Sequence, residues 1–119
     1  MKRRELGVAG EKIAKDFLRK RGYKIIESNF RCPHGEIDII ATKDNCVAFV
    51  EVRTRSGNAF GTPEESITST KRERLISTAL TYLAGHPSLP EDWRIDLLAI
   101  ETDSEGKVQR LSVIENAII

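Results

Sequence analysis

The sequence predicts a small α/β domain in which a mixed β-sheet is flanked by helices. Three observations support this prediction: two segments with apolar residues at helical spacing, several strand-like segments, and short polar connections between them. The chain has 119 residues, which suits one domain, and we treat residues 1–119 as a single unit. Its hydrophobic fraction of 39% and charged fraction of 31% are typical of a globular protein.

The first predicted helix covers residues 4–21. Apolar side chains such as Ile13 and Phe17 recur at helical spacing, and the basic residues between them lie outside that stripe. Gly22 follows directly and is typical of a helix C-terminus. Glu11 lies at the margin of the apolar stripe, so we expect it to be half-buried beside the sheet.

Three strands are expected next, at 23–30, 36–42 and 46–54, with a turn at 31–35. The connection between the second and third strands is short and polar, which predicts an antiparallel hairpin. Period-two alternation assigns the side chains of each strand to two faces. In the strand at 36–42, one face carries Glu36, Asp38 and Ile40 and the other carries Ile37, Ile39 and Ala41. In the strand at 46–54, one face carries Phe49, Glu51 and Arg53 and the other carries Val50 and Val52.

The second half of the chain predicts a helix at 69–84 and strands at 93–101 and 108–114. The segment Thr70–Glu73 has the pattern of a capping box at the start of that helix, and Thr62–Glu65 could cap a helical turn before it. The glycine-containing stretch 56–68 could form a flap that orders on substrate. The predicted order is α-β-β-β-α-β-β.

Asp38 and Glu51 interrupt two otherwise apolar strands, and the short hairpin brings their charged faces side by side. Cross-strand neighbours lie roughly 5 Å apart at Cβ, and two carboxylates that close repel unless a proton or cation lies between them. Mg²⁺ prefers oxygen ligands and often binds one or two carboxylates. Spacing alone leaves a second interpretation open, in which these acids and Arg53 form a solvated sheet face with ordinary ion pairs.

A metal at this pair would suit phosphodiester hydrolysis, because it activates water and stabilises the leaving oxygen. Arg53, two residues beyond Glu51 on the same face, would bind the phosphate, and Glu11 could approach as a further ligand. A zinc site built from Cys32, His34 and Cys46 is a weaker alternative, because their spacing suits tetrahedral coordination poorly.

Charge is distributed unevenly although the formal net charge is only +1. Lys and Arg predominate in residues 1–24, whereas Asp and Glu predominate in 25–51 and 91–119. The sequence has neither an apolar run of about 20 residues nor a secretory signal, so we expect a cytoplasmic protein without a membrane span.

Three segments in order, 10–14, 35–41 and 49–55, closely resemble the YraN-type family. That bacterial family is assigned to the PD-(D/E)XK nuclease superfamily and is similar to archaeal Holliday-junction resolvases. The resemblance runs through nearly the whole chain. It implies a restriction-endonuclease-like core and a Mg²⁺- or Mn²⁺-dependent endonuclease, with Asp38 and Glu51 at the two acidic motif positions and Glu11 at the helix-1 glutamate.

Two residues depart from the superfamily motif. Ile37 stands where the motif has proline, which is common variation. Arg53 stands where the motif has lysine, and arginine cannot act as a base. Activity is therefore a weaker expectation than fold.

Basic residues are expected to hold DNA, branched DNA included, through its phosphates rather than its bases. Our candidates are Arg53, Arg55, Lys71, Arg72, Arg19 and Lys20. A homodimer would extend so small a surface. Two alternatives to an endonuclease stay open: a nucleic-acid-binding module with little or no catalysis, and a protein-interaction domain.

Overall fold

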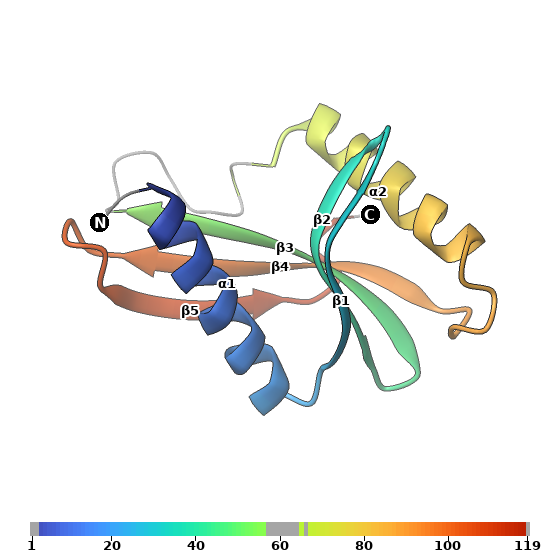
Figure 1. Cartoon of the computed structure of the whole chain (residues 1–119), viewed down its shortest axis with the longest axis horizontal. Coiled ribbons are helices and arrows are strands. Elements are labelled where there is room, and N and C mark those ends of the chain that lie inside the picture. Colours follow the sequence, from blue (N-terminus) through green and yellow to red (C-terminus); the bar gives the residue numbers. More distant parts are fainter. Residues whose placement is uncertain (1–2, 57–64, 66, 119) are drawn as a thin grey trace.

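The structure, a computed structural model, describes residues 3–56, 65 and 67–118, with side chains from residue 10 onward. These residues form one five-stranded sheet and two helices (Figure 1). The elements in chain order are α1 (Arg3–Lys20), β1 (Lys24–Cys32), β2 (Gly35–Lys43), β3 (Cys46–Ser56), α2 (Ser69–Ala84), β4 (Trp93–Thr102) and β5 (Val108–Ile114).

The strands lie side by side in the order of the sequence, β1-β2-β3-β4-β5. All neighbours are antiparallel except β3 and β4, which run parallel. A parallel pair needs a crossover connection, and α2 lies in the connection between these two strands. The predicted α/β class with a mixed sheet is therefore confirmed, and element boundaries agree with the predictions within about two residues.

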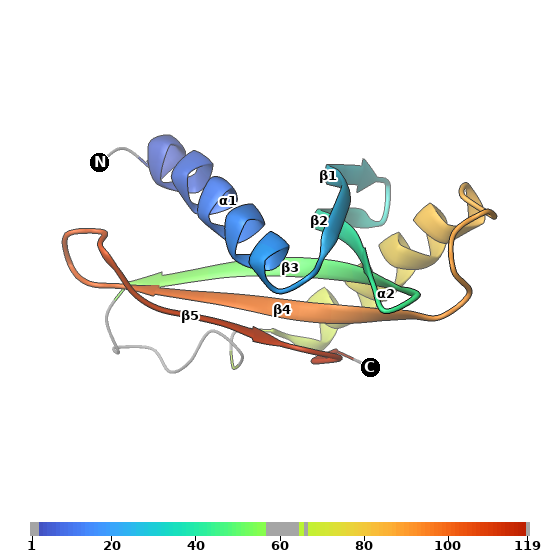
Figure 2. The same ribbon diagram turned by 90° about the horizontal axis from the view of Figure 1, so that it is seen from below.

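The two helices pack against opposite faces of the sheet (Figures 1 and 2). Ala14 and Leu18 of α1 belong to one buried apolar cluster, and Leu75 and Ala79 of α2 belong to the other. Alternation in β3 divides its side chains between the clusters, because Phe49 joins the α2 side and Val50 the α1 side. No helix in the described part of the chain combines the length and apolar character needed to cross a membrane.

The β1–β2 hairpin rises out of the plane of β3, β4 and β5 (Figure 2). Pairing between β2 and β3 runs from Lys43 and Cys46 to Ile39 and Val50 and ends there, whereas β2 continues to pair with β1. The two strands thus diverge at a fork, which we define as the opening between β2 and β3 beyond the Ile39–Val50 pair.

The fork corrects one prediction about β2. Strict alternation put Ile37 on the face of Ile39 and opposite Ile40, but Ile37 packs in the same cluster as Ile40 while Ile39 packs in the other. The physical reason is that β2 leaves the sheet between these positions, so a two-residue period no longer describes which side of the sheet a residue faces.

The helix α2 begins as predicted at Ser69, but its cap differs from the prediction. The hydroxyl of Thr68 accepts a hydrogen bond from the N–H of Lys71 at 3.1 Å, so Thr68 and not Thr70 is the N-cap residue. The flap expected at 56–68 and the turn at 62–65 lie largely outside the described residues.

Candidate active site

Asp38 lies at the fork, where β2 has left β3. The N–H of Val52 donates a hydrogen bond of 2.8 Å to Asp38 Oδ2. Beyond the last β2–β3 pair, the Asp38 carboxylate thus takes the place of a backbone carbonyl of β2 as the acceptor. Burial, followed by a hydrogen bond with Glu51 and repulsion by its charge, raises the pKa of Asp38 to about 7. The predicted proximity of these two acids is therefore present in the folded chain.

Glu51 is only 4% exposed and is held by two cations from different elements. Arg53 of β3 approaches Glu51 Oε2 to 3.3 Å, and Lys71 of α2 approaches the same oxygen to 3.2 Å. The Thr68 cap determines where α2 starts and so which residue of its first turn faces the sheet. Both cations thus pair with Glu51, whereas Lys71 acts on Asp38 only through its charge.

Lys71 is the residue whose role the sequence interpretation missed. We expected it only to contact nucleic acid, yet its ammonium group lies directly on the acidic pair. A signal was present, because Lys71 precedes Leu75 by four residues, and Leu75 belongs to the apolar stripe that faces the sheet. A lysine at this position supplies the chemical group that Arg53 lacks.

Glu11 lines the same cleft as Asp38 but is engaged by other partners. The cleft has a volume of about 240 Å³ and also includes Asn29, Val52 and Thr54. Asn29 Nδ2 donates to Glu11 Oε1 at 3.1 Å, and Lys15 Nζ lies 3.1 Å from the same oxygen. Asn29 has a φ of 56°, a backbone conformation that Asn tolerates better than most residues.

The fit of a divalent ion to this site can be tested on its oxygen donors. Burial and contact with Glu51 raise the pKa of Asp38, a cation at Asp38 would relieve that repulsion, and Asp38 lines the adjoining cleft. Among the side chains described, however, no three His, Cys, Asp or Glu residues form a metal site by themselves. The residues present therefore fit a metal held by two carboxylates, with Glu11 nearby.

The basic residues predicted to contact DNA are divided between different parts of the molecule. Arg53 and Lys71 lie at the acidic pair, and the buried Nε of Arg53 has no acceptor among the described residues. Arg55 lies two residues further along β3. Arg72 lines a separate pocket with Leu97 and Ile118, whereas Arg19 and Lys20 are exposed in the last turn of α1.

The zinc alternative has no geometric support. Cys32 and Cys46 lie at opposite ends of β2, one at the turn from β1 and the other at the turn to β3. A nine-residue strand separates them by roughly 25 Å.

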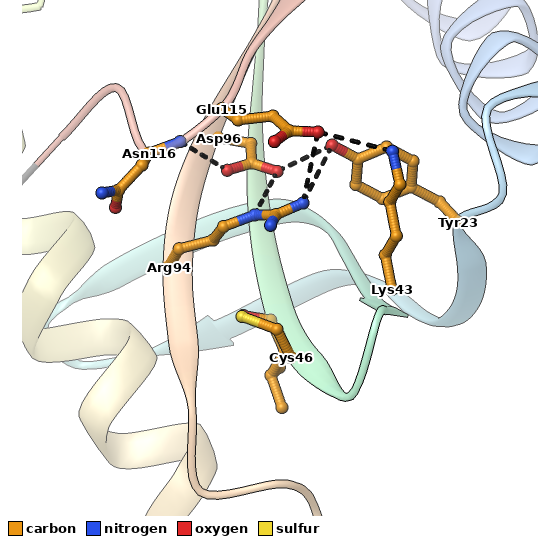
Figure 3. Close-up of polar contacts among 8 residues, drawn as sticks. Tyr23, Lys43, Cys46, Arg94, Asp96, Glu115 and Asn116 are labelled. Carbon is orange, nitrogen blue, oxygen red and sulfur yellow. Dashed lines mark hydrogen bonds and ion pairs between the residues drawn. The ribbon is translucent and has the colours of Figure 1, made fainter.

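A second group of charged residues surrounds Asp96 of β4 on the other side of β3 (Figure 3). Asp96 is fully buried and accepts hydrogen bonds from Tyr23 Oη at 2.8 Å, Arg94 Nε at 3.0 Å and the N–H of Asn116 at 2.8 Å. Glu115 lies 3.6 Å from Arg94 and 3.4 Å from Lys43. We call this set the Asp96 network; it ties the end of α1 to β4 and to the segment after β5.

Comparison with known proteins identifies the family. Residues 10–100 match the model described as "Uncharacterised protein family UPF0102". A UPF0102 protein of Roseiflexus castenholzii is 48% identical over 119 residues, covering 98% of this chain and 95% of the relative. A UPF0102 protein of Moorella thermoacetica is 43% identical over 117 residues and 98% of both chains.

These matches span the acidic pair, Lys71 and the Asp96 network, and relatives at this identity share a fold along their aligned length. The resemblance carried by the three motif segments is therefore confirmed, and the chain belongs to the uncharacterised protein family UPF0102, the YraN-type family.

Proposed function

We propose that this protein is a Mg²⁺- or Mn²⁺-dependent endonuclease with a PD-(D/E)XK-type core, acting in the cytoplasm on DNA of branched or otherwise structured form. The observation that carries the proposal is the buried contact between Asp38 and Glu51 at the fork, with Lys71 and Arg53 on Glu51. Two acids in contact inside a protein raise the free energy of the charged state, and such an arrangement is typical of a functional site.

Asp38 and Glu51 would hold the metal, which when bound would lower the pKa of a water molecule and neutralise charge on the phosphate. Hydrolysis joins the water oxygen to phosphorus and breaks the bond to the leaving oxygen, which takes up a proton. Lys71 Nζ, 3.2 Å from Glu51, is positioned to hydrogen-bond the attacking water or a phosphate oxygen. Arg53 cannot exchange a proton, so we assign it to phosphate binding.

The experiment compares cleavage of duplex, single-stranded, flap and four-way-junction DNA with Mg²⁺, with Mn²⁺ and with EDTA. We expect Asp38→Asn and Glu51→Gln to lose at least about 100-fold in cleavage rate. Lys71→Ala should lose more activity than Arg53→Lys, because only the first removes the amine. Glu73→Gln is the control, since Glu73 is an exposed acid on the same helix as Lys71.

Wild type and Asp38→Asn behaving alike on every substrate and metal would reject the endonuclease proposal. A second candidate, a nucleic-acid-binding module without cleavage, is favoured by Arg53 in the motif position of lysine. It would be supported by salt-sensitive DNA binding that persists in Asp38→Asn and by absence of cleavage in the wild type.

A further inference from the structure

A basic cleft lies on the α2 side of the fork, between the β1–β2 turn and the first half of α2. Its volume is about 470 Å³. Three cationic side chains line it, Arg31 from β1 and Lys71 and Arg74 from α2. The carboxylate that also lines it, Glu36, pairs with Arg31 at 3.1 Å. The cleft therefore has a positive balance, unlike the acidic pair beside it.

The wall of the basic cleft is fixed by close packing of the hairpin turn against α2. Gly35 has a φ of 150°, and a Cβ added there would lie 3.2 Å from Thr78 Oγ1 and 3.6 Å from Arg74 Cβ. Thr78 Oγ1 in turn donates to the carbonyl of Arg74 at 2.7 Å, and Cys32 Sγ donates to Thr78 Oγ1 at 3.8 Å. The backbone that carries Arg74 is thus held before any ligand arrives.

Lys71 connects the basic cleft to the acidic pair, because it lines the cleft and contacts Glu51. Arg74 follows Lys71 by three residues, so their side chains leave α2 on neighbouring positions of one face, about 5–6 Å apart at Cβ. Successive phosphates of a nucleic-acid strand have a comparable separation. A nucleic-acid strand with one phosphate at Lys71 would therefore place the next phosphate at Arg74.

We propose that this cleft binds the sugar–phosphate backbone next to the scissile phosphate, with Arg74 and Arg31 contacting the neighbouring phosphate. The inference rests on the proposed function for the position of the scissile bond. It assigns the substrate strand to the side of the fork that faces α2, and it gives Arg31 and Arg74 a defined place beside the scissile phosphate.

The two cysteines provide a direct test. Cys32 lines the basic cleft, whereas Cys46 lies at the far end of β2. Burial raises the pKa of both thiols, but at Cys32 hydrogen bonds with the backbone of His34 and with Thr78 outweigh burial and lower its pKa. Cys32 should therefore react faster with N-ethylmaleimide.

Alkylation rates are measured by peptide mass spectrometry on the full chain in EDTA, with and without a single-stranded or four-way-junction DNA. We expect bound DNA to slow modification of Cys32 at least fivefold and to leave Cys46 unchanged. Inorganic phosphate at equal phosphate concentration should protect Cys32 much less, because it contacts one cation site instead of several. Equal rates at Cys32 with and without bound DNA would overturn the proposal.

Charge reversal gives the second measurement. Arg74→Glu and Arg31→Glu are each expected to weaken DNA binding about tenfold and to reduce the salt slope. Arg110→Glu on β5 carries the same change of charge and should bind like the wild type. Arg72→Glu, on the same helix but lining another pocket, should weaken binding less than Arg74→Glu.

The outcomes separate this inference from the proposed function. Cleavage that requires Asp38, without protection of Cys32 and without an effect of Arg74→Glu, would reject the cleft and leave the endonuclease intact. Protection of Cys32 together with weakened binding by Arg74→Glu, in a protein that cleaves no substrate, would support the cleft and reject the endonuclease. DNA that does not bind would reject the cleft.

Discussion

Asp38 and Asp96 are aspartates on the two strands that flank β3, and their surroundings differ in kind. Asp96 has no exposed surface and accepts hydrogen bonds from Tyr23, Arg94 and the N–H of Asn116 (Figure 3). Asp38 accepts one backbone hydrogen bond and faces a second carboxyl group, that of Glu51. Asp96 is therefore paired directly with a cation, Arg94, whereas the cations beside Asp38 pair with Glu51.

The difference separates two uses of a buried acid. A carboxylate surrounded by donors loses little by ionising, and it joins segments that are distant in sequence. A carboxylate that faces another acid resists ionisation, so it either keeps a proton or binds a positive charge. The Asp96 network is therefore interpreted as structural and the acidic pair as the candidate functional site, although each has an aspartate and a glutamate with an arginine in contact.

The largest expected effect concerns stability at Asp96. Asp96→Ala leaves Arg94 Nε, the Tyr23 hydroxyl and the N–H of Asn116 without their shared acceptor, and we expect a loss of about 3–5 kcal/mol in the free energy of unfolding. Urea denaturation at pH 7 measures it. Asp16→Ala removes an exposed ion pair with Arg19 and should cost less than about 1 kcal/mol. Equal losses in the two variants would contradict a structural role for Asp96.

Asp38→Asn should change stability in the opposite direction. Because the pKa of Asp38 is raised in the folded state, the folded chain keeps a proton that the unfolded chain releases at lower pH. Wild-type stability should therefore fall as pH rises from about 4 to about 7, and Asp38→Asn should lack this part of the fall. Above pH 7 the variant should be more stable by up to about 4 kcal/mol, because one pKa unit corresponds to about 1.4 kcal/mol.

Urea unfolding at pH 5, 6, 7 and 8 tests this prediction, with Asp96→Asn as the matched variant that should gain nothing at any pH. Mn²⁺ added at pH 8 should stabilise the wild type and not Asp38→Asn, because a bound cation replaces the proton. Parallel stability curves for wild type and Asp38→Asn would show that the pKa of Asp38 is not raised by folding.

Secondary structure was largely predictable from the sequence because the periods of apolar residues are local. Apolar spacing indicated both helices and all five strands to within about two residues. Alternation failed at Ile37, where β2 leaves the sheet, because that bend depends on where pairing with β3 ends. The position of the helix cap was not fixed by the sequence pattern either, because two threonines close together could each cap α2, and Thr68 rather than Thr70 is the N-cap.

The candidate site was only partly predictable. The short hairpin brought Asp38 and Glu51 together, since hairpin register follows from neighbouring residues. Lys71 lies on α2, in the crossover connection between the parallel strands β3 and β4. Its contact with Glu51 therefore depends on how α2 packs against the sheet. The same holds for Asp96, which accepts hydrogen bonds from the connection between α1 and β1 and from the segment after β5. Long-range contacts of this kind leave no fixed spacing in the sequence.

Tyr23→Phe should give the smallest effect and sharpens the interpretation of Asp96. The variant removes one donor from Asp96 while leaving Arg94 Nε and the N–H of Asn116 in place. We expect a loss of about 1.5–3 kcal/mol in unfolding free energy, the usual range for a hydrogen bond to a charged group. DNA cleavage by the folded variant should not change, because the network lies on the other side of β3 from the acidic pair. A loss of cleavage without a loss of stability would instead couple the two buried acids through β3, and the division between a structural and a functional aspartate would be wrong.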